Sequence, residues 1–525
     1  MSGTTSAKQA ATPFRNCIFL LLLSLAAVFL HSYHPYVEDA EIYVPAIKKA
    51  LDPSLYPHDA HLFTGQTRFS LFPVVTAGLV RSSHLSLDWV LLLLHTGSIY
   101  LLLLGAWRIS RQCFPLESAS WYGVILLACL LTLPVAGTAL YIVDEYLTPR
   151  TVATFAVLWA LASWLERKPA RTVFWLAVSF VFHPLMAAFG VCYLAVLLAQ
   201  DAAHRWRPGT TVSAFAAFAL PVSSNAYHEA VGTRSYLFLT RWEWYEWLGA
   251  IGPLGLLGLF YRVARRKNLA VLGRLSQALL IFGLLFFLAG LLISLVPHLL
   301  FLAEFQPLRS LHLVYILLIL FGGGLLAEFV LQRKTKRWLL LFLPLCAGMF
   351  YAQQALFPAT PHVEWPGAAT KNPWVESFLW IRQNTPRDAW FALDPRYMEL
   401  PGEDEHGFRA IAERSRMADW IKDPGAVTIA PKLAEEWWRQ VQALRGWQSF
   451  RPADFRGLRR GFGVSWVVVG TPQHDGLICH GPALALHASD HARVLLLDAV
   501  DVGDLLQQVL EPVGLEHDVD QIGWA

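Results

Sequence analysis

Charged residues are scarce in this 525-residue chain. Only 15% of the residues are Asp, Glu, Lys or Arg, whereas 55% are hydrophobic, and soluble domains usually carry about 25% charged residues. The deficit indicates that lipid is the solvent for much of the chain. The formal net charge of +3 is too small to indicate a nucleic-acid partner.

Cysteine is also rare, and its positions exclude some stabilising devices. Five of the six cysteines lie in or beside apolar runs, where a thiol behaves as a small hydrophobic group. Cys479 is the only cysteine in the polar C-terminal part, which therefore has no partner for an internal disulfide. The sequence has no CxxC motif and no Cys/His cluster, so we predict neither a structural zinc site nor a resident cofactor.

A signal-peptide cleavage site is missing after the first apolar run. Lys8 and Arg15 precede residues 17–30 in the charge order of a secretory signal, but residues 31–36 are bulky and aromatic. No small-x-small site follows the apolar run. We therefore expect an uncleaved first membrane helix.

Long apolar segments make up most of residues 1–356. A membrane-spanning helix needs about 20 apolar residues, and fewer where helices are broken or half-length. The candidate segments are 17–30, 88–107, 118–138, 148–165, 172–200, 210–222, 246–261, 276–296, 310–331 and 338–356.

The segment 172–200 is too long for one crossing and is interrupted by His183-Pro184. Proline breaks the helical hydrogen-bond ladder and disfavours helical geometry in the preceding residue. Basic residues flank both ends of the segment, so both ends belong in the cytoplasm. We therefore predict two short helices, with the His183-Pro184 turn toward the outside.

Splitting that segment predicts a polytopic α-helical membrane protein with about eleven crossings. The N-terminus is then cytoplasmic, and residues 1–356 form a membrane domain whose first loop, residues 31–87, is external. Residues 357–525 form a soluble extracytoplasmic domain. Every strong basic cluster falls on the cytoplasmic side, as membrane proteins prefer: Lys8/Arg15, Arg108/Arg111, Arg167/Lys168/Arg171, Arg205/Arg207, Arg262/Arg265/Arg266/Lys267 and Arg333/Lys334/Lys336/Arg337.

One apolar stretch within the first external loop is ambiguous. Residues 69–80 are short for a crossing and contain Pro73, so we assign them to a helix lying on the membrane surface. If they crossed the bilayer, the orientation of everything after them would be inverted.

Residues 357–525 have the mixed pattern of a small α/β domain. Asn372 is the cap and Pro373 the first residue of a helix predicted over 372–383. A second helical pattern covers 431–444. Apolar and β-branched runs predict strands at 389–393, 464–469 and 493–497.

Paired carboxylates follow the first helix directly at Glu38-Asp39, with Glu41 close behind. Ionisable residues at membrane helices are costly and usually mark a site. Such a pair can act as a general base or bind a divalent ion. The structural alternative is a solvated helix start, because acidic side chains favour the positive end of a helix running to residue 51.

A second acidic pair, Asp144-Glu145, precedes Arg150. Thr148 followed by Pro149 is a good helix entry, so a capped terminus is the structural explanation. Arg150 then sits inside the outer end of a membrane helix, where an unpaired guanidinium is expensive. It needs an anion, which is either one of the nearby carboxylates or a phosphate ligand.

Three further residues at the outer face are candidates. His183 lies at the broken-helix turn, as a ligand or as a hydrogen-bonded structural residue. Arg309 and His312 are one turn apart, which predicts one shared helix face. Arginine recognises phosphate oxygens through a forked pair of donors, although an interfacial arginine also snorkels for purely structural reasons.

These pieces together resemble the GT-C superfamily of membrane glycosyltransferases. The shared features are an acidic pair right after the first helix, which Glu38-Asp39 matches, surface-lying helices in the first loop, many crossings and an external C-terminal domain. Within that class, the chain is most similar to a group of large, uncharacterised bacterial membrane proteins. The motifs that carry this likeness are Tyr146-Leu147-Thr148-Pro149-Arg150, Phe182-His183-Pro184-Leu185-Met186, the segment 380–389, and the C-terminal pattern of Arg409, Arg414, Arg416, Asp419, Trp420, Glu436, Trp437 and Trp438 followed by 462–469.

The resemblance implies an enzyme of the bacterial inner membrane. It would move a sugar from a polyprenyl-phosphate donor to an envelope acceptor on the extracytoplasmic side, and the C-terminal domain would help to bind that acceptor. Asp39 would be the base, with Glu38 the next candidate, and Arg309 and Arg150 would neutralise the leaving phosphate. GT-C enzymes occur with and without a metal ion, so metal dependence stays open. The other candidate substrate-binding residues are His183, Asp144, Glu145 and His312.

Two other classes of function compete with this interpretation. Broken helices with polar turns also suit a transporter or flippase for a lipid-linked or small substrate, although the sequence shows no paired halves. The third class is a non-catalytic assembly or sensor protein, because the C-terminal part has no nucleotide, metal or nucleophile motif of its own.

Overall fold

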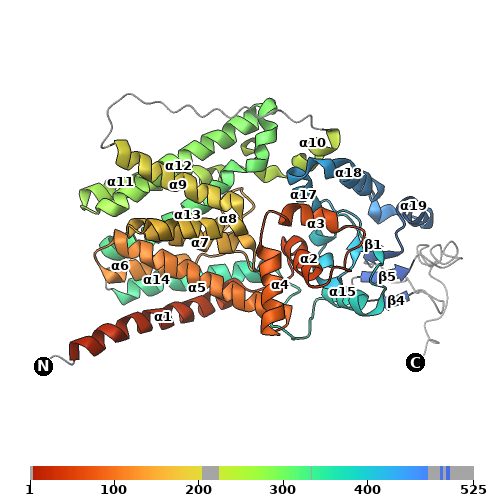
Figure 1. The fold of residues 1–525 in the computed structure, drawn as a ribbon, viewed down its shortest axis with the longest axis horizontal. Helices are drawn as coiled ribbons and strands as arrows, with labels where there is room; N and C mark the ends of the chain where they lie inside the picture. The colour runs from red at the N-terminus through yellow and green to blue at the C-terminus, as the bar shows by residue number, and fades with distance from the viewer. Residues whose placement is uncertain (1–3, 204–223, 333, 471–484, 489–491, 497–525) are drawn as a thin grey trace.

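The structure is a computed structural model that describes residues 4–203, 224–332, 334–470, 485–488 and 492–496. A bundle of roughly parallel helices occupies one side of the molecule, and the N-terminus lies at its far end (Figure 1). Elements of the first loop and of the C-terminal part gather at the other end. The crossing expected at 210–222 lies outside the described residues.

Several helices identify a multi-pass membrane protein. Within the described residues, seven stretches are long and apolar enough to cross a bilayer. The predicted total of eleven crossings stays a prediction. The seven stretches are Phe14–His31 within α1 (Thr4–His31), α5 (Leu87–Cys113), Pro184–Asp201 within α9 (Pro184–Ala203), α11 (Trp244–Arg266), α12 (Ala270–Leu295), Phe301–Leu331 around α13 (Leu311–Leu325), and α14 (Thr335–Leu356).

Shorter helices fill the bundle between these stretches. α7 (Pro149–Leu165) packs against α5 and α8 (Pro169–Phe182), and α6 (Glu117–Ala128) packs against α13. α8 ends where α9 begins, at His183-Pro184, so the predicted break in the segment 172–200 is confirmed.

The crossing predicted at 118–138 is helical only as far as Ala128. Residues 129–148 form turns, with a bridge between Pro134 and Tyr141 and left-handed backbone at Ala136 and Ala139. Pro134 in this segment lacks the amide proton that would continue the helical hydrogen-bond ladder. This irregular segment reaches the end of the bundle nearest the C-terminal elements and ends at the start of α7.

The ambiguous apolar stretch of the first loop forms α4 (Phe72–Ser83), which runs across the bundle direction in Figure 1. Phe72 and Ala77 are buried on one face, whereas Val74, Val75 and Leu79 are exposed on the other. An exposed apolar face on a short helix is typical of a helix lying on a membrane surface.

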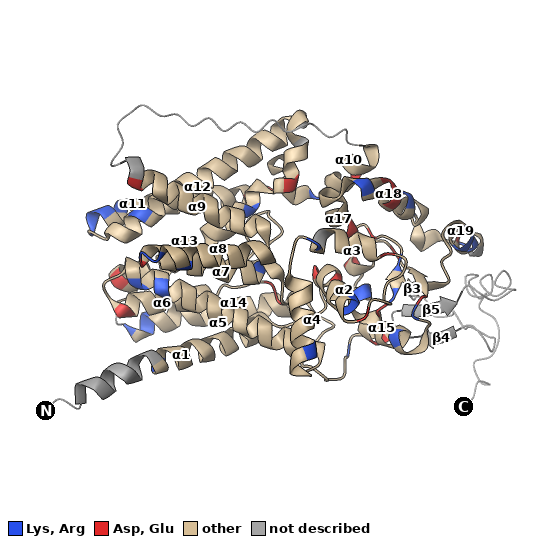
Figure 2. Ribbon diagram, viewed as in Figure 1, with Lys and Arg blue, Asp and Glu red and all other residues tan. Residues whose placement is uncertain are grey.

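Lys and Arg residues, drawn blue, gather at the end of the bundle away from the C-terminal elements, notably at the end of α11, with some Asp and Glu residues among them (Figure 2). The opposite end carries both signs of charge, from the first loop and the C-terminal part. This distribution agrees with the basic clusters on which the predicted orientation rests.

The C-terminal elements form a three-layer α/β arrangement. The mixed sheet has the order β2-β1-β3-β5-β4, with β1 parallel to β2 and β3, and β5 antiparallel to β3 and β4. The strands predicted at 389–393, 464–469 and 493–497 are observed as β1, β3 and β5. The bounds are β1 Trp390–Ala392, β2 Ser415–Arg416, β3 Trp466–Gly470, β4 Ala485–Ala488 and β5 Ala492–Leu496.

Helices cover both faces of this sheet because side chains of a strand alternate between faces. Trp466 and Val468 of β3 pack with α15 (Pro373–Asn384). Val467 packs on the other face, with α19 (Pro452–Phe462). Asn372 caps α15 as predicted, since its Oδ1 accepts hydrogen bonds from the amides of Trp374 and Val375 at 2.9 and 3.3 Å.

The first loop packs into the C-terminal elements (Figure 1). α2 (Ala40–Leu51) contacts α16 (Phe408–Ala412), and α3 (Ala60–Thr67) contacts α17 (Asp423–Ile429). The backbone joins them as well, because Val37 pairs with His406 in an isolated bridge. The remaining helices nearby are α10 (Asn225–Gly232) and α18 (Ala434–Ala443), the second of which lies within the helical pattern predicted at 431–444.

Candidate functional site

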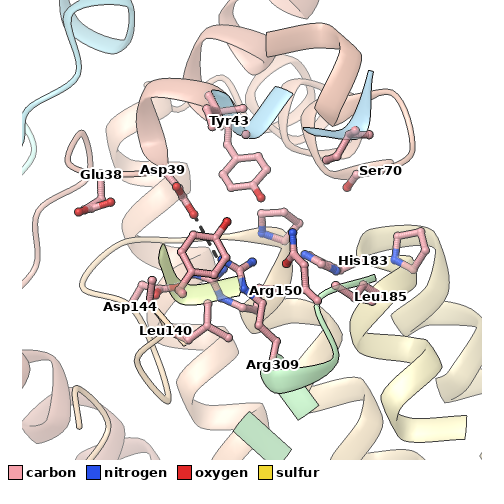
Figure 3. A pocket seen from close by; sticks show the side chains of 18 of the residues that line it. Glu38, Asp39, Tyr43, Ser70, Leu140, Asp144, Arg150, His183, Leu185 and Arg309 are labelled. Atoms are coloured by element: carbon pink, nitrogen blue, oxygen red, sulfur yellow. Dashed lines mark hydrogen bonds and ion pairs between the residues drawn. The ribbon is translucent and has the colours of Figure 1, made fainter. Parts of the chain in front are cut away.

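A cavity of about 780 Å³ lies where the end of the helix bundle meets the first loop and the C-terminal part. Its wall is built from the start of α2, the segment 134–150, the α8–α9 turn, the residues before α13, and α17. Seven of the eight site residues predicted from the sequence line it (Figure 3), although they come from four separate segments: Glu38, Asp39, Asp144, Glu145, Arg150, His183 and Arg309.

Asp39 directs its carboxylate into the cavity from the start of α2. Asp39 is the N-cap residue of that helix, and its side chain makes no capping hydrogen bond to it. Its amide donates to the Tyr146 hydroxyl at 3.0 Å. The nearest cations are Arg150, with Nη1 3.9 Å from Oδ2, and Lys422, with Nζ 3.6 Å from Oδ1.

Arg150 joins the two acidic pairs. Its Nη2 donates to Asp144 Oδ2 at 2.7 Å, while Nη1 faces Asp39 (Figure 3). Thr148 caps α7 by accepting a hydrogen bond from the Thr151 amide, and its hydroxyl also donates to Asp144. The helix cap and the ion pair expected at this position therefore both occur. Arg150 is 4% exposed, so the pair is nearly dry.

Arg309 is the least satisfied cation of the cavity. It lies in the 3₁₀ turn Pro307–Ser310, and its guanidinium stacks over the Tyr236 ring at 4.8 Å. Its Nε is buried without a hydrogen-bond partner. Among the described residues, no carboxylate is within ion-pair distance of it. The guanidinium groups of Arg150 and Arg309 thus face one cavity (Figure 3), where Arg150 pairs with Asp144 and Asp39 and Arg309 has no such pair among the described residues.

Glu145 differs from its neighbour Asp144. Its side chain is 2% exposed and its Oε1 has no hydrogen-bond partner. Burial, reinforced by the charge of Asp144, raises the pKa of Glu145 to about 8. The cavity wall therefore carries a carboxyl group that holds its proton at neutral pH.

The two histidines predicted for the site have different surroundings. His183 lines the cavity, and its Nδ1 accepts a long hydrogen bond of 3.4 Å from the Met186 amide at the start of α9. His312 does not line the cavity. Its Nε2 bonds the Ile142 carbonyl at 2.9 Å.

Lys422 was not among the predicted site residues. It precedes α17, is buried, and contacts the carboxylate of Glu38 as well as facing Asp39. No local pattern signals it, because its partners lie near the other end of the sequence. Tyr43 and Tyr146 are further polar residues of the cavity wall.

One side of the cavity is apolar. Phe69, Phe180 and Phe305 line it and are 53%, 60% and 48% exposed. Leu185 and Ala188 of α9 continue this side. The cavity therefore has a charged wall and an apolar wall, and the apolar wall is suited to contact with lipid.

A buried charge network fixes the start of α2 against the C-terminal part. Arg409 donates from Nη1 and Nη2 to Asp423 at 2.8 and 3.0 Å, and Arg416 donates from Nε to Glu41 at 2.9 Å. Paired charges of this kind persist in a dry environment only when their geometry is good. The network consists of Glu41 and Asp59 from the first loop and Arg409, Arg416, Asp419 and Asp423 from the C-terminal part, each at most 2% exposed.

Among the described residues, no three His, Cys, Asp or Glu side chains are placed to hold a metal ion together.

Residues 372–444 match the family model described as a domain of unknown function (DUF6798). They include the four C-terminal residues of the buried network and Lys422. No curated protein matches the sequence.

Two solved structures are similar to this chain. One is the oligosaccharyltransferase of Archaeoglobus fulgidus in the apo form, at 11% identity and a TM-score of 0.43, covering 86% of this chain and 69% of that chain. The other is the oligosaccharyltransferase AglB of the same organism in complex with an inhibitory peptide and a dolichol-phosphate, at 12% identity and a TM-score of 0.40 over the same shares.

Proposed function

We propose that this protein is a GT-C-type glycosyltransferase that moves a sugar from a polyprenyl-phosphate donor to an envelope acceptor. The observation that carries the proposal is the meeting of Asp39, Arg150 and Arg309 in one cavity with an apolar side. A carboxylate opposite two guanidinium groups suits a reaction in which a hydroxyl loses a proton and a phosphate leaves.

Each part of the cavity has a task in this reaction. The acceptor hydroxyl oxygen attacks the anomeric carbon of the donor, and its proton passes to Asp39, while the bond from that carbon to the phosphate oxygen breaks. The negative charge of the leaving polyprenyl phosphate then faces Arg309 and Arg150, whose forked donors match phosphate oxygens. The polyprenyl chain extends along Phe180 and Leu185 toward lipid.

The orientation belongs to the same proposal. Residues 1–356 form the membrane domain of a bacterial inner-membrane protein with eleven crossings and a cytoplasmic N-terminus. The first loop and residues 357–525 lie outside. The contacts between α2 and α16 support a common side for these two parts. Reporter fusions at the first loop and at the C-terminal part test it, because activity on opposite sides of the membrane would contradict the orientation.

Transfer is better supported than transport. The candidate residues meet at one end of the bundle, next to the C-terminal part, rather than midway between two similar halves.

A deletion strain tests the proposed function. We expect loss of one envelope glycan and accumulation of its lipid-linked sugar donor, with recovery by the wild-type gene but not by Asp39→Asn. Asp388→Asn, which changes an exposed carboxylate of the C-terminal part, is the matched control and should restore the glycan. Full recovery by Asp39→Asn would instead favour the non-catalytic assembly protein.

A further inference from the structure

Lys422 brings a cation from the C-terminal part to the carboxylates that begin α2. Its Nζ contacts the Glu38 carboxylate and lies 3.6 Å from Asp39 Oδ1. The residue is 6% exposed. The ammonium group therefore occupies the junction of the two predicted catalytic carboxylates and the cavity.

The backbone of Lys422 is held on both sides. Its amide donates to Asp419 Oδ1 at 2.8 Å, and its carbonyl accepts a hydrogen bond from Arg234 Nη2 at 2.8 Å. Asp419 is itself fixed, because its Oδ2 accepts from Arg416 Nη2 at 2.6 Å. The backbone position of Lys422 is thus set by the buried network and by Arg234.

The same network holds the other side of the contact. Arg416 reaches Glu41, which lies one turn beyond Glu38 in the chain, and Arg409 reaches Asp59 beside α3. These hydrogen bonds therefore fix the position of the first loop relative to the start of α17.

We propose, on the basis of the proposed function, that residues 372–444 serve to present Lys422 as a positioning residue. Its ammonium group orients the carboxylates of Glu38 and Asp39 and offsets their charge where the donor phosphate approaches. Without it, the guanidinium of Arg150 would be the only described cation within ion-pair distance of these two carboxylates.

The charge of Lys422 depends on pH near neutrality. Burial lowers the pKa of Lys422 to about 7. The carboxylates of Glu38 and Asp39 that face it favour the charged form. The other charged groups packed around it, Asp419 and Arg234, meet its backbone. Arginine keeps its charge at any pH that proteins tolerate, so the charge at this position does not change with pH in Lys422→Arg.

Hydrogen–deuterium exchange of the full chain tests positioning without any ligand. In Lys422→Met we expect residues 38–43 to exchange about tenfold faster or more, because the start of α2 loses its anchor. α15 serves as the internal reference for global unfolding and should not change. The exposed Lys432→Met is the matched control, and Lys422→Arg should protect residues 38–43 as the wild type does. Equal exchange in Lys422→Met and Lys432→Met would overturn the positioning role.

Binding of farnesyl phosphate, a short prenyl monophosphate, tests the electrostatic role. In full-length protein held in lipid nanodiscs, we expect Lys422→Met to weaken binding about tenfold or more and Lys422→Arg to retain it. Wild-type affinity should fall relative to Lys422→Arg as the pH rises through about 7, because only the lysine loses its charge. If Lys422 had only a structural role, the ratio of the wild-type affinity to the Lys422→Arg affinity would not change with pH.

The two experiments separate the two proposals. If the wild type does not bind farnesyl phosphate, the proposed donor class is wrong, and the exchange result alone decides whether Lys422 positions α2. If the wild type binds it and Lys422→Met binds equally well, the role of Lys422 is wrong and the proposed donor class stands.

Discussion

Arg416 Nε donates a hydrogen bond to Glu41 Oε1 at 2.9 Å, although the two residues are 375 positions apart in the sequence. Arg416 belongs to β2 in the C-terminal sheet, and Glu41 lies in the first turn of α2. Through this contact the sheet reaches the loop that carries Asp39. The C-terminal part is therefore a structural component of the cavity wall and not an appendage to the membrane domain.

Arg416→Met should destabilise the junction strongly. The substitution leaves Glu41, Asp419 and Asp423 short of a cation in a dry environment, and breaking a buried pair in this way costs about 3–5 kcal/mol. Denaturant unfolding of the purified protein measures the loss. Arg387→Met is the control, since its pair with Asp52 is exposed and should contribute nothing measurable. Equal stabilities of the two variants would contradict the importance of the network.

Gly407→Ala should separate α2 from the C-terminal part. A Cβ at Gly407 would lie 2.9 Å from Glu41 Cβ and 3.0 Å from its Cα, so the helix backbone itself would have to move. Overpacking of this kind costs about 1–3 kcal/mol, and unfolding experiments measure it. Gly457→Ala in α19 has open space around the new methyl group and should be neutral or stabilising. Tolerance of Gly407→Ala would show that the contact is looser than described.

Glu145→Gln should stabilise the protein. Burial raises the pKa of Glu145 from its usual value of 4.5 to about 8 in the folded protein. Between these two pH values the folded protein keeps a proton on Glu145 that the unfolded chain has lost. The stability of the wild type therefore falls as the pH rises from 4.5 toward 8, whereas that of Glu145→Gln does not. At pH 7 the variant should gain on the order of 3 kcal/mol. Unfolding curves across this pH range measure the difference, and a destabilised variant would show that Glu145 is ionised.

Glu145 costs stability and yet lines the cavity, which is typical of a functional group. The glycan assay should therefore show reduced activity for Glu145→Gln despite its greater stability. Full activity would assign Glu145 a place in the wall only.

His406→Gln should weaken the protein in a pH-dependent way. Burial alone would lower the pKa of His406, but the adjacent Glu364 carboxylate raises it above 6.5 overall. The stability that the charged imidazole contributes is fully present below pH 6.5 and is lost as the pH rises through the folded-state pKa. The difference in melting temperature between wild type and His406→Gln should therefore be largest near about pH 5.5 and shrink toward about pH 9.

Other titratable groups surround His406 in both the wild type and His406→Gln. His34, whose pKa is lowered by burial, also bonds Glu364, and Asp404 lies nearby in the chain. They are present in both proteins, but the charge of His406 adds to burial in lowering the pKa of His34, so the pKa of His34 should be higher in His406→Gln than in the wild type. A difference that grows with pH would show that His406 is neutral in the folded protein.

Local signals allowed much of the fold to be predicted. His183-Pro184 interrupts the helical pattern, and the basic residues at both ends of 172–200 required a return. Asn372 followed by Pro373 is a complete helix start within two residues. The end of α6 at Ala128 was missed, because an apolar composition continues through residues that turn back on themselves.

The site was predictable only as a set of separate fragments. Glu38-Asp39, Arg150 and Arg309 stand out because charge near a membrane helix is costly, which holds for each residue without knowledge of the others. Lys422 could not be found in this way, since its importance arises from a contact with Glu38 across 384 positions. His312 was predicted to belong to the same site, but it does not line the cavity, because its imidazole bonds the Ile142 carbonyl.

The most direct test of the account is a cryo-electron-microscopy map of the full-length protein in lipid nanodiscs with added polyprenyl phosphate. The account predicts phosphate density in contact with Arg309 and Arg150, with the Asp39 carboxylate facing it and the prenyl chain leaving along Phe180. Lipid phosphate bound elsewhere, with Arg309 turned toward lipid and away from the Asp39 carboxylate, would contradict it.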